Sequence, residues 1–224
     1  MTPTDNAMTP RYDTHADWYL EYTRDWGSVL HDHLPGSLGG QRVLDLCCGY
    51  GTLSRTLAAR GARVVGVDLS SRLIDRARQL EAAHPAGIDY LVGDATKTDW
   101  WDGRPFDRVV CNMALMDVDD LDGVLASAAR MLAPSAVFSF AIFHPCFPGD
   151  AGSRPSWPEA GYAREGWWTT AEEGVRGHVG AQHRMLSTYL NALIAAGLVL
   201  DRVSEPPTPV PTLLIADCRP AQRR

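Results

Sequence analysis

Short apolar runs alternate with segments of helical periodicity along most of this 224-residue chain, and this alternation limits the folds that it can adopt. Seven apolar runs are typical of strands, at residues 43–46, 64–67, 88–92, 106–111, 136–143, 198–203 and 213–218. Helical spacing of apolar residues predicts helices over 15–34, 53–58, 73–80, 121–132 and 182–196. Such alternation predicts a single α/β domain with a mostly parallel seven-stranded sheet, helices on both faces and an antiparallel last strand.

Composition and charge exclude several classes of partner. The chain is 45% hydrophobic and its formal net charge is −6, so it can bury a core but has no excess of positive charge to neutralise phosphates. We therefore expect neither a nucleic acid nor a membrane as partner, and the oligomeric state stays open. Residues 1–11 lack the apolar segment of a signal peptide, which favours a cytoplasmic location. The five cysteines have no Cys-x-x-Cys spacing, so reduced thiols are expected.

Closely spaced glycines follow the first predicted strand. Gly49 and Gly51 would let a ligand approach the backbone where a helix begins with free amides, although a tight turn without a ligand has the same pattern. An acidic residue, Asp68, ends the second strand 17 residues after Gly51. A carboxylate at that place can accept hydrogen bonds from both hydroxyls of a ribose.

Two residues around this turn argue against a dinucleotide. Ser54 stands where the Gly-x-Gly-x-x-Gly fingerprint has its third glycine, and the carboxylate of Asp45 would repel a pyrophosphate. Asp45 would attract an ammonium group instead. The pattern therefore favours a nucleoside that carries a cationic amino-acid tail, and an NAD-dependent oxidoreductase is the weaker alternative.

Four motifs in order resemble those of the class I S-adenosylmethionine-dependent methyltransferases. They are residues 43–51 around the glycines, 65–70 around Asp68, 93–95 after the third strand and 106–112 over the fourth. This resemblance, with a leader at 12–13 and 16–19, covers about residues 12–140 and implies a Rossmann-like fold and the cofactor S-adenosylmethionine. It departs at Cys47, which replaces the first glycine, and at residues 112–115, which lack the Asn/Asp-Pro-Pro-Tyr/Phe of enzymes that methylate nucleic-acid bases.

The resemblance also implies roles for individual residues. Asp45 would orient the methionine ammonium, Gly49 and Gly51 would admit the cofactor, Asp68 would bind the ribose, and Asp94 would bond to the adenine amino group. The other residues implied to contact the cofactor are Cys47, Leu69, Ala95 and Asn112 from the matching motifs, and Tyr12 and Tyr19 from the leader helix.

Histidines are the candidates for a general base, which is needed only if the acceptor must lose a proton. His144 ends the fifth strand, and His183 lies at the start of the last helix, as does His178 nearby. His144 and His183 are the predicted catalytic residues, with a role in the scaffold as the alternative. A zinc site made of the three histidines and Cys146 has irregular spacing, and no metal is predicted.

Acidic residues also gather before the fourth predicted helix, at Asp117, Asp119, Asp120 and Asp122. Carboxylates in this position can bind a divalent ion, but they also cap a helix and stabilise its positive end. We expect residues 117–120 to cap the helix.

The composition changes between His144 and Val179. This stretch contains Phe147, Trp157, Tyr162, Trp167 and Trp168. The rings can form a lid over a planar substrate, or they can fasten a long loop onto the sheet. The expected organisation is a helical cap at 1–40, a cofactor-binding core at 41–143, a lid insertion at 144–180, and a C-terminal helix and strands at 181–224. Residues 177–197 also resemble a region of small-molecule methyltransferases.

The predicted function is methyl transfer to a small molecule through an oxygen, nitrogen or carbon atom. A non-catalytic subunit that binds S-adenosylmethionine is the alternative from another class.

Overall fold

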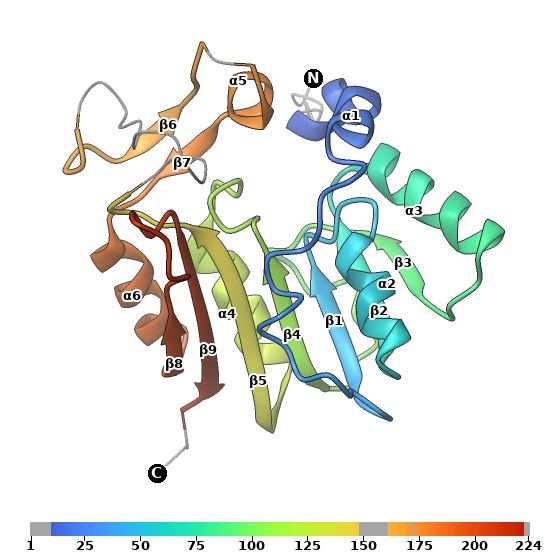
Figure 1. The fold of residues 1–224 in the computed structure, drawn as a ribbon. Coiled ribbons are helices and arrows are strands. Elements are labelled where there is room, and N and C mark those ends of the chain that lie inside the picture. The colour runs from blue at the N-terminus through green and yellow to red at the C-terminus, as the bar shows by residue number, and fades with distance from the viewer. Residues whose placement is uncertain (1–9, 148–160, 172, 222–224) are drawn as a thin grey trace, which may run out of the picture.

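The computed structural model describes residues 10–147, 161–171 and 173–221. Its main sheet has seven strands in the order β3-β2-β1-β4-β5-β9-β8 (Figure 1). These are β1 (Arg42–Leu46), β2 (Arg63–Asp68), β3 (Asp89–Val92), β4 (Phe106–Asn112), β5 (Leu132–Phe143), β8 (Leu198–Ser204) and β9 (Leu213–Pro220). Strands β1 to β5 are parallel, and β9 lies antiparallel between β5 and β8. The predicted Rossmann-like α/β fold and its antiparallel last strand are confirmed.

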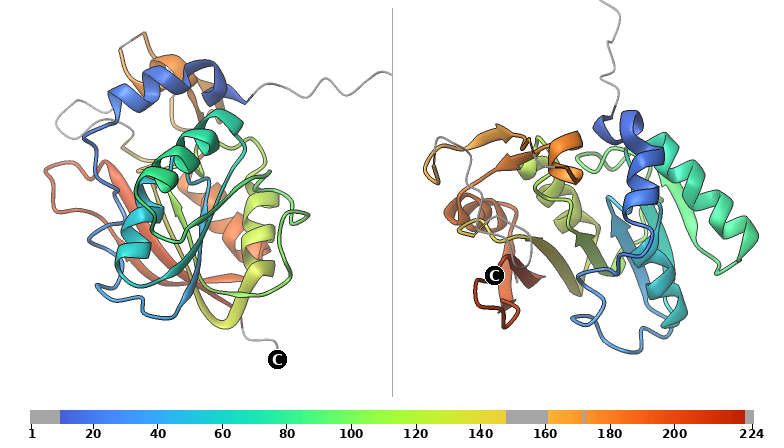
Figure 2. Two further views of the ribbon diagram at one scale, coloured as in Figure 1. Left: turned by 90° about the vertical axis from the view of Figure 1, so that its right-hand side faces the viewer. Right: turned by 45° about the horizontal axis from the view of Figure 1, so that its top comes forward.

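Helices cover both faces of the sheet. Helices α2 (Thr52–Ala59) and α3 (Ser71–Ala83) lie on one face, and α4 (Leu121–Met131) and α6 (Leu186–Ala195) lie on the other (Figures 1 and 2). Val109 and Val110 of β4 are both fully buried, but each belongs to the core of a different face. Burial on two faces explains why these strands have continuous apolar sequences. The Ser70 side chain caps α3 by accepting a hydrogen bond from the Leu73 N–H.

The leader helix is shorter than its apolar spacing predicts. Helix α1 runs over Arg11–Tyr22, and the predicted helix over 15–34 is wrong beyond Tyr22. The Thr23 hydroxyl donates to the Tyr19 carbonyl oxygen at the end of the helix, and Gly27 follows in an irregular segment. Leu30 from this segment is fully buried beneath the sheet face that α2 and α3 cover. Burial of apolar side chains from turns therefore imitates a helical pattern.

Two other boundaries differ from the prediction. Residues 182 and 183 belong not to the last helix but to β7 (Ala181–His183), which pairs antiparallel with β6 (Gly166–Trp168). Strand β5 begins directly after α4, so Pro134 lies inside the strand range instead of separating the two elements. The proline is tolerated because the β4–β5 register skips residues between Leu132 and Val137.

A small layer covers the carboxyl ends of the parallel strands. One part of this layer is α1. The other part is residues 166–184, which include β6, α5 (Val175–Val179) and β7, and we call these residues the cover. Helices α1 and α5 lie side by side above the sheet (Figure 2). Trp157 of the predicted lid lies outside the described residues, and a lid function stays a prediction. Among the described helices, none has the length and apolar character needed to span a membrane.

Candidate active site

A cavity of about 780 Å³ lies at the carboxyl ends of the parallel strands, beneath α1 and the cover. Its volume is within the ~300–1,000 Å³ typical of small-molecule sites. Ten of the eleven residues implied to contact a cofactor line it: Tyr12, Tyr19, Asp45, Cys47, Gly49, Asp68, Leu69, Asp94, Ala95 and Asn112. The fold thus brings together residues from five separate segments of the chain.

The loop after β1 contains three residues with left-handed backbone, and each has a different reason. A Cβ on Gly49 (φ 57°) would meet nothing within 4 Å, so this glycine leaves the cavity wall open to a ligand. A Cβ on Gly51 (φ 85°) would lie 2.1 Å from the Tyr90 hydroxyl oxygen, so Gly51 serves packing and does not line the cavity. Cys47 adopts φ 58° with a side chain, at a cost of roughly 1–2 kcal/mol.

Asp45 is a buried carboxylate at the end of β1. It is 1% exposed, and the Ser54 hydroxyl donates to its Oδ2 over 2.6 Å. Burial raises the pKa of Asp45 to about 7, and the nearby Asp68 carboxylate contributes to the increase. Among the described side chains, none forms an ion pair with Asp45. An ammonium group of a ligand would supply that missing charge, so the site fits the cofactor that the sequence implies.

Asp68 is the last residue of β2, next to β1, and Asp94 follows β3, which lies beyond β2 in the sheet. The Asp68 carboxylate accepts N–H bonds from Gly49 at 2.8 Å and from Ser70 at 2.9 Å, which fixes its orientation. Burial raises its pKa. Asp94 accepts the N–H and the hydroxyl of Thr96 at 2.9 and 2.8 Å. Partial burial acts to raise the pKa of Asp94, but these hydrogen bonds outweigh that effect, and the pKa is lowered overall. Both carboxylates keep lone pairs for a ligand.

The leader tyrosines lie against each other on the cavity wall. Their ring centroids are 5.0 Å apart with an edge-on arrangement. The Tyr12 hydroxyl donates to Asp117 Oδ2 over 2.8 Å. Burial, followed by the Asp117 carboxylate, raises the pKa of Tyr12 well above its ordinary value. Asn112 lines the cavity too, and its side-chain oxygen accepts the Leu30 N–H at 3.1 Å, which ties the irregular leader to β4.

The two predicted catalytic histidines are buried but are not among the described residues that line the cavity. His144 Nδ1 accepts the Cys146 N–H at 3.0 Å, so its Nε2 carries a proton and donates to Glu205 at 2.8 Å. His183 Nε2 lies 2.8 Å from the Tyr162 carbonyl oxygen. These contacts hold the two ends of the segment between β5 and α6. Their catalytic role stays a prediction.

The acidic loop before α4 differs from its prediction in two residues. Asp120 does cap α4, because its side chain accepts the Gly123 N–H at 2.8 Å. Asp117 and Asp119 do not cap the helix, and the prediction for them is wrong. Asp117 pairs with Arg176 of α5, whereas Asp119 pairs with Arg11 of α1. Within the described residues, no group of three His, Cys, Asp or Glu side chains can hold a metal ion.

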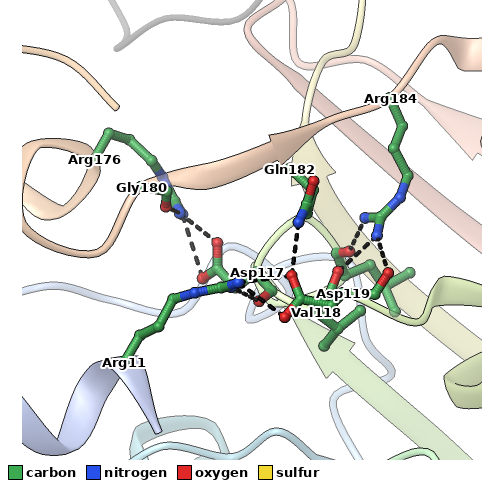
Figure 3. A network of polar contacts seen from close by, with 9 residues as sticks. Arg11, Asp117, Val118, Asp119, Arg176, Gly180, Gln182 and Arg184 are labelled. Atoms are coloured by element: carbon green, nitrogen blue, oxygen red, sulfur yellow. Dashed lines mark hydrogen bonds and ion pairs between the residues drawn. The ribbon is translucent and has the colours of Figure 1, made fainter. Parts of the chain in front are cut away.

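The loop containing Asp117 and Asp119 holds the cover in place (Figure 3). The Arg184 guanidinium donates to the carbonyl oxygens of Leu115, Val118 and Asp119 at 2.6–3.1 Å. Gln182 donates its side-chain amide to Asp119 at 2.6 Å. Sequence reasoning missed these arginines because their partners are about 60 residues or more away. The aspartates themselves were the only available signal.

Comparison with known proteins agrees with this arrangement. Residues 43–135 match a family model described as a methyltransferase domain. A crystal structure of an S-adenosylmethionine-dependent methyltransferase from Mesorhizobium loti is 32% identical, with a TM-score of 0.67, over 85% of this chain and 95% of that one. A putative methyltransferase from Listeria monocytogenes has a TM-score of 0.68 at 24% identity, over 86% and 95% of the two chains.

Curated relatives match over shorter stretches. A demethylmenaquinone methyltransferase from Renibacterium salmoninarum is 32% identical over 142 residues, which are 62% of this chain and 57% of the relative. A ubiquinone biosynthesis O-methyltransferase from Hahella chejuensis is 35% identical over 108 residues, 48% and 45% of the two chains. The chain thus spans about half the length of these curated relatives.

The sheet order and the row of carboxylates at its edge define a Rossmann-like nucleoside-binding protein. The similarity to the Mesorhizobium loti methyltransferase extends over 85% of this chain and identifies the family within that class. The chain belongs to the S-adenosylmethionine-dependent methyltransferases, and S-adenosylmethionine is the cofactor, as the sequence resemblance implied.

Proposed function

We propose that the chain transfers a methyl group from S-adenosylmethionine to a small-molecule acceptor. The observation that carries this proposal is the row of Asp45, Asp68 and Asp94 at the ends of three adjacent strands, facing one cavity. In the proposal, Asp45 meets the methionine ammonium, Asp68 the ribose and Asp94 the adenine. Tyr12 and Tyr19 enclose the methionine end. The bound cofactor supplies an electrophilic methyl group, and the chain supplies alignment and exclusion of water.

The division of labour expected from the sequence remains part of this proposal. In this proposal the core at 41–143 binds the cofactor, the helical cap at 1–40 covers its methionine end, 144–180 is the lid insertion, and 181–224 supplies the C-terminal helix and strands. A small acceptor is supported by the curated relatives, whose names refer to menaquinone and ubiquinone biosynthesis. The position of the cavity beneath α1 and the cover (Figure 2) also favours a small acceptor over a nucleic acid.

Calorimetric titration with S-adenosylmethionine, S-adenosylhomocysteine and NAD tests the proposal. We expect the first two to bind and NAD not to bind. Asp68→Ala should weaken binding by a few kcal/mol because charge-assisted bonds to the ribose are lost. Because an ammonium group lowers the pKa of a neighbouring carboxyl, binding near pH 7 should also release protons in the unmodified chain and not in Asp45→Asn. Binding of NAD alone would overturn the proposal.

The general-base prediction has its own test. If His144 or His183 is the base, its Asn variant binds S-adenosylhomocysteine normally and loses turnover. Full turnover in both variants would show that neither histidine is the base and that alignment of the reactants is the main source of catalysis. Cofactor binding without turnover on any acceptor would favour the alternative of a non-catalytic subunit.

A further inference from the structure

The charged side chains that line the cavity are mostly acidic. The acidic ones are Asp45, Asp68, Asp94, Asp117, Asp119, Asp120 and Glu173, and the basic ones among the described residues are Arg11 and Arg176. Because a cavity lined by one sign of charge repels ligands of the same sign, the balance already disfavours an anionic ligand.

Both arginines are themselves neutralised by carboxylates of one loop. Arg11 donates two bonds to the Asp119 carboxylate, at 2.6 and 2.8 Å. Arg176 pairs with Asp117, and its Nη1 also donates to the Gly180 carbonyl oxygen at 2.6 Å. The Arg176 and Asp117 side chains are 14% and 13% exposed, whereas the Arg11 and Asp119 side chains are 34% and 53% exposed. The pair made by Arg176 is therefore the enclosed one.

The enclosed pair lies between the leader tyrosines and the wall contributed by β5, because the Tyr12 hydroxyl donates to Asp117 over 2.8 Å and Arg176 lies over the Phe143 ring. Asp45, Asp68 and Asp94 lie at the carboxyl ends of β1, β2 and β3, whereas another part of the wall comes from β5, β9 and the cover. That wall presents aromatic rings at Phe143 and Trp168, and the Arg176 guanidinium lies 5.3 Å from the Phe143 ring centroid.

An acceptor that reaches this part of the cavity meets aromatic side chains and a cation whose charge is already matched. A carboxylate placed there would lose its hydration without gaining a free positive partner, and it would approach Asp117 itself. An uncharged aromatic molecule loses much less hydration, and a cationic one is attracted by the acidic lining that compensates its loss of water. The aromatic side chains can contact either molecule.

We propose that the cavity accepts aromatic molecules that carry no negative charge, and that Asp117 determines this selectivity by neutralising Arg176. The inference rests on the proposed function, because it concerns the acceptor of the same cavity. Removing the Asp117 charge frees Arg176, which then becomes a binding site for an anion of the same shape.

The probes are benzamide and benzoate, which share a shape and differ in charge, titrated calorimetrically in saturating S-adenosylhomocysteine. We expect benzoate to bind the unmodified chain at least tenfold more weakly than benzamide. The affinity for benzoate should rise at least tenfold in the Asp117→Asn variant. Asp119→Asn is the matched control. Its affinity for benzoate should rise less than twofold, because the partner of Asp119, Arg11, is partly exposed to water.

Two results would overturn the inference. One is benzoate binding to the unmodified chain as tightly as benzamide, and the other is no gain in a folded Asp117→Asn variant. If that variant does not fold, Arg176→Gln serves instead, because it leaves the Asp117 charge unmatched. Its affinity for benzylamine relative to benzamide should rise at least tenfold. Absence of that rise would also overturn the inference. Failure to bind S-adenosylhomocysteine contradicts the proposed function instead, and the same titrations without it then still test the charge selectivity.

Discussion

The Ser54 hydroxyl donates to the buried Asp45 carboxylate over 2.6 Å, from the first turn of α2 to the end of β1. This contact explains two departures from a dinucleotide site together. Ser54 occupies the place of a third glycine, and Asp45 precedes the turn where a pyrophosphate would need positive partners. The serine is therefore the partner that lets a carboxylate remain buried beside the glycine loop.

We predict that Ser54→Ala lowers the free energy of unfolding by about 1–3 kcal/mol, because Asp45 loses its hydrogen bond while it stays buried. Chemical denaturation at pH 8, where the carboxyl is charged, measures the effect. The control is Ser127→Ala, a buried serine whose hydroxyl donates to carbonyl oxygens of Ala95 and Val124. The Ser54 loss should shrink at pH 5 and the Ser127 loss should not; equal pH profiles would contradict the assignment.

We predict that stability without ligand falls as the pH rises from about 4 to about 7. Burial raises the pKa of Asp45 to about 7, whereas the unfolded chain has an ordinary value of about 3.9. The folded state therefore holds a proton that the unfolded state has lost in this window. The contribution is full below pH 4, and its loss approaches 1.4 kcal/mol per pH unit. Denaturation of Asp45→Asn and the unmodified chain across this range isolates it, and identical slopes would refute it.

We predict that alanine at two glycines of one loop has different consequences, with ligand binding impaired directly only at Gly49. Gly51→Ala should destabilise the fold by more than about 1 kcal/mol, because its Cβ would collide with the buried Tyr90 hydroxyl. Gly49→Ala should cost about 1 kcal/mol for its positive φ and weaken S-adenosylhomocysteine binding, because its Cβ projects into open cavity space. Thermal unfolding and calorimetry measure the two effects. A Gly49→Ala variant with unchanged affinity would place the ligand elsewhere.

We predict that Arg184→Met lowers the free energy of unfolding by about 2–4 kcal/mol, because three backbone carbonyl oxygens lose a charged donor. Arg164→Met is the control, since Arg164 is exposed, and it should change stability by less than about 0.5 kcal/mol. Hydrogen exchange of residues 115–119 should increase in Arg184→Met alone. Unchanged exchange there would show that the loop does not depend on the cover.

Local sequence was sufficient for the core of the fold. Strands such as β4 and β5 are buried on both faces, so their apolar runs carried the strand prediction without any knowledge of neighbours. The Ser70 cap is also a local contact, because its bond to Leu73 spans only three residues. The carboxylates Asp45, Asp68 and Asp94 were recognised because each lies at or just after the carboxyl end of a strand of the parallel sheet.

The boundaries that failed depend on contacts between distant segments. The helical spacing beyond Tyr22 reflects burial of Leu30 under the sheet, and β7 exists only because β6 pairs with it. Neither partner is visible in a local window of sequence. The two predicted catalytic histidines hold the ends of the segment between β5 and α6, and their catalytic role stays a prediction.

The sequence by itself determined the α/β architecture and the row of carboxylates, because both arise from residues within one strand and the turn after it. Only the tertiary structure decided which charges in the cavity wall are matched by a partner. Asp117 looked like a helix cap until Arg176, 59 residues later, was seen to pair with it. Periodicity reports which residues are buried, but the partner of a buried charge is set by how the whole chain packs.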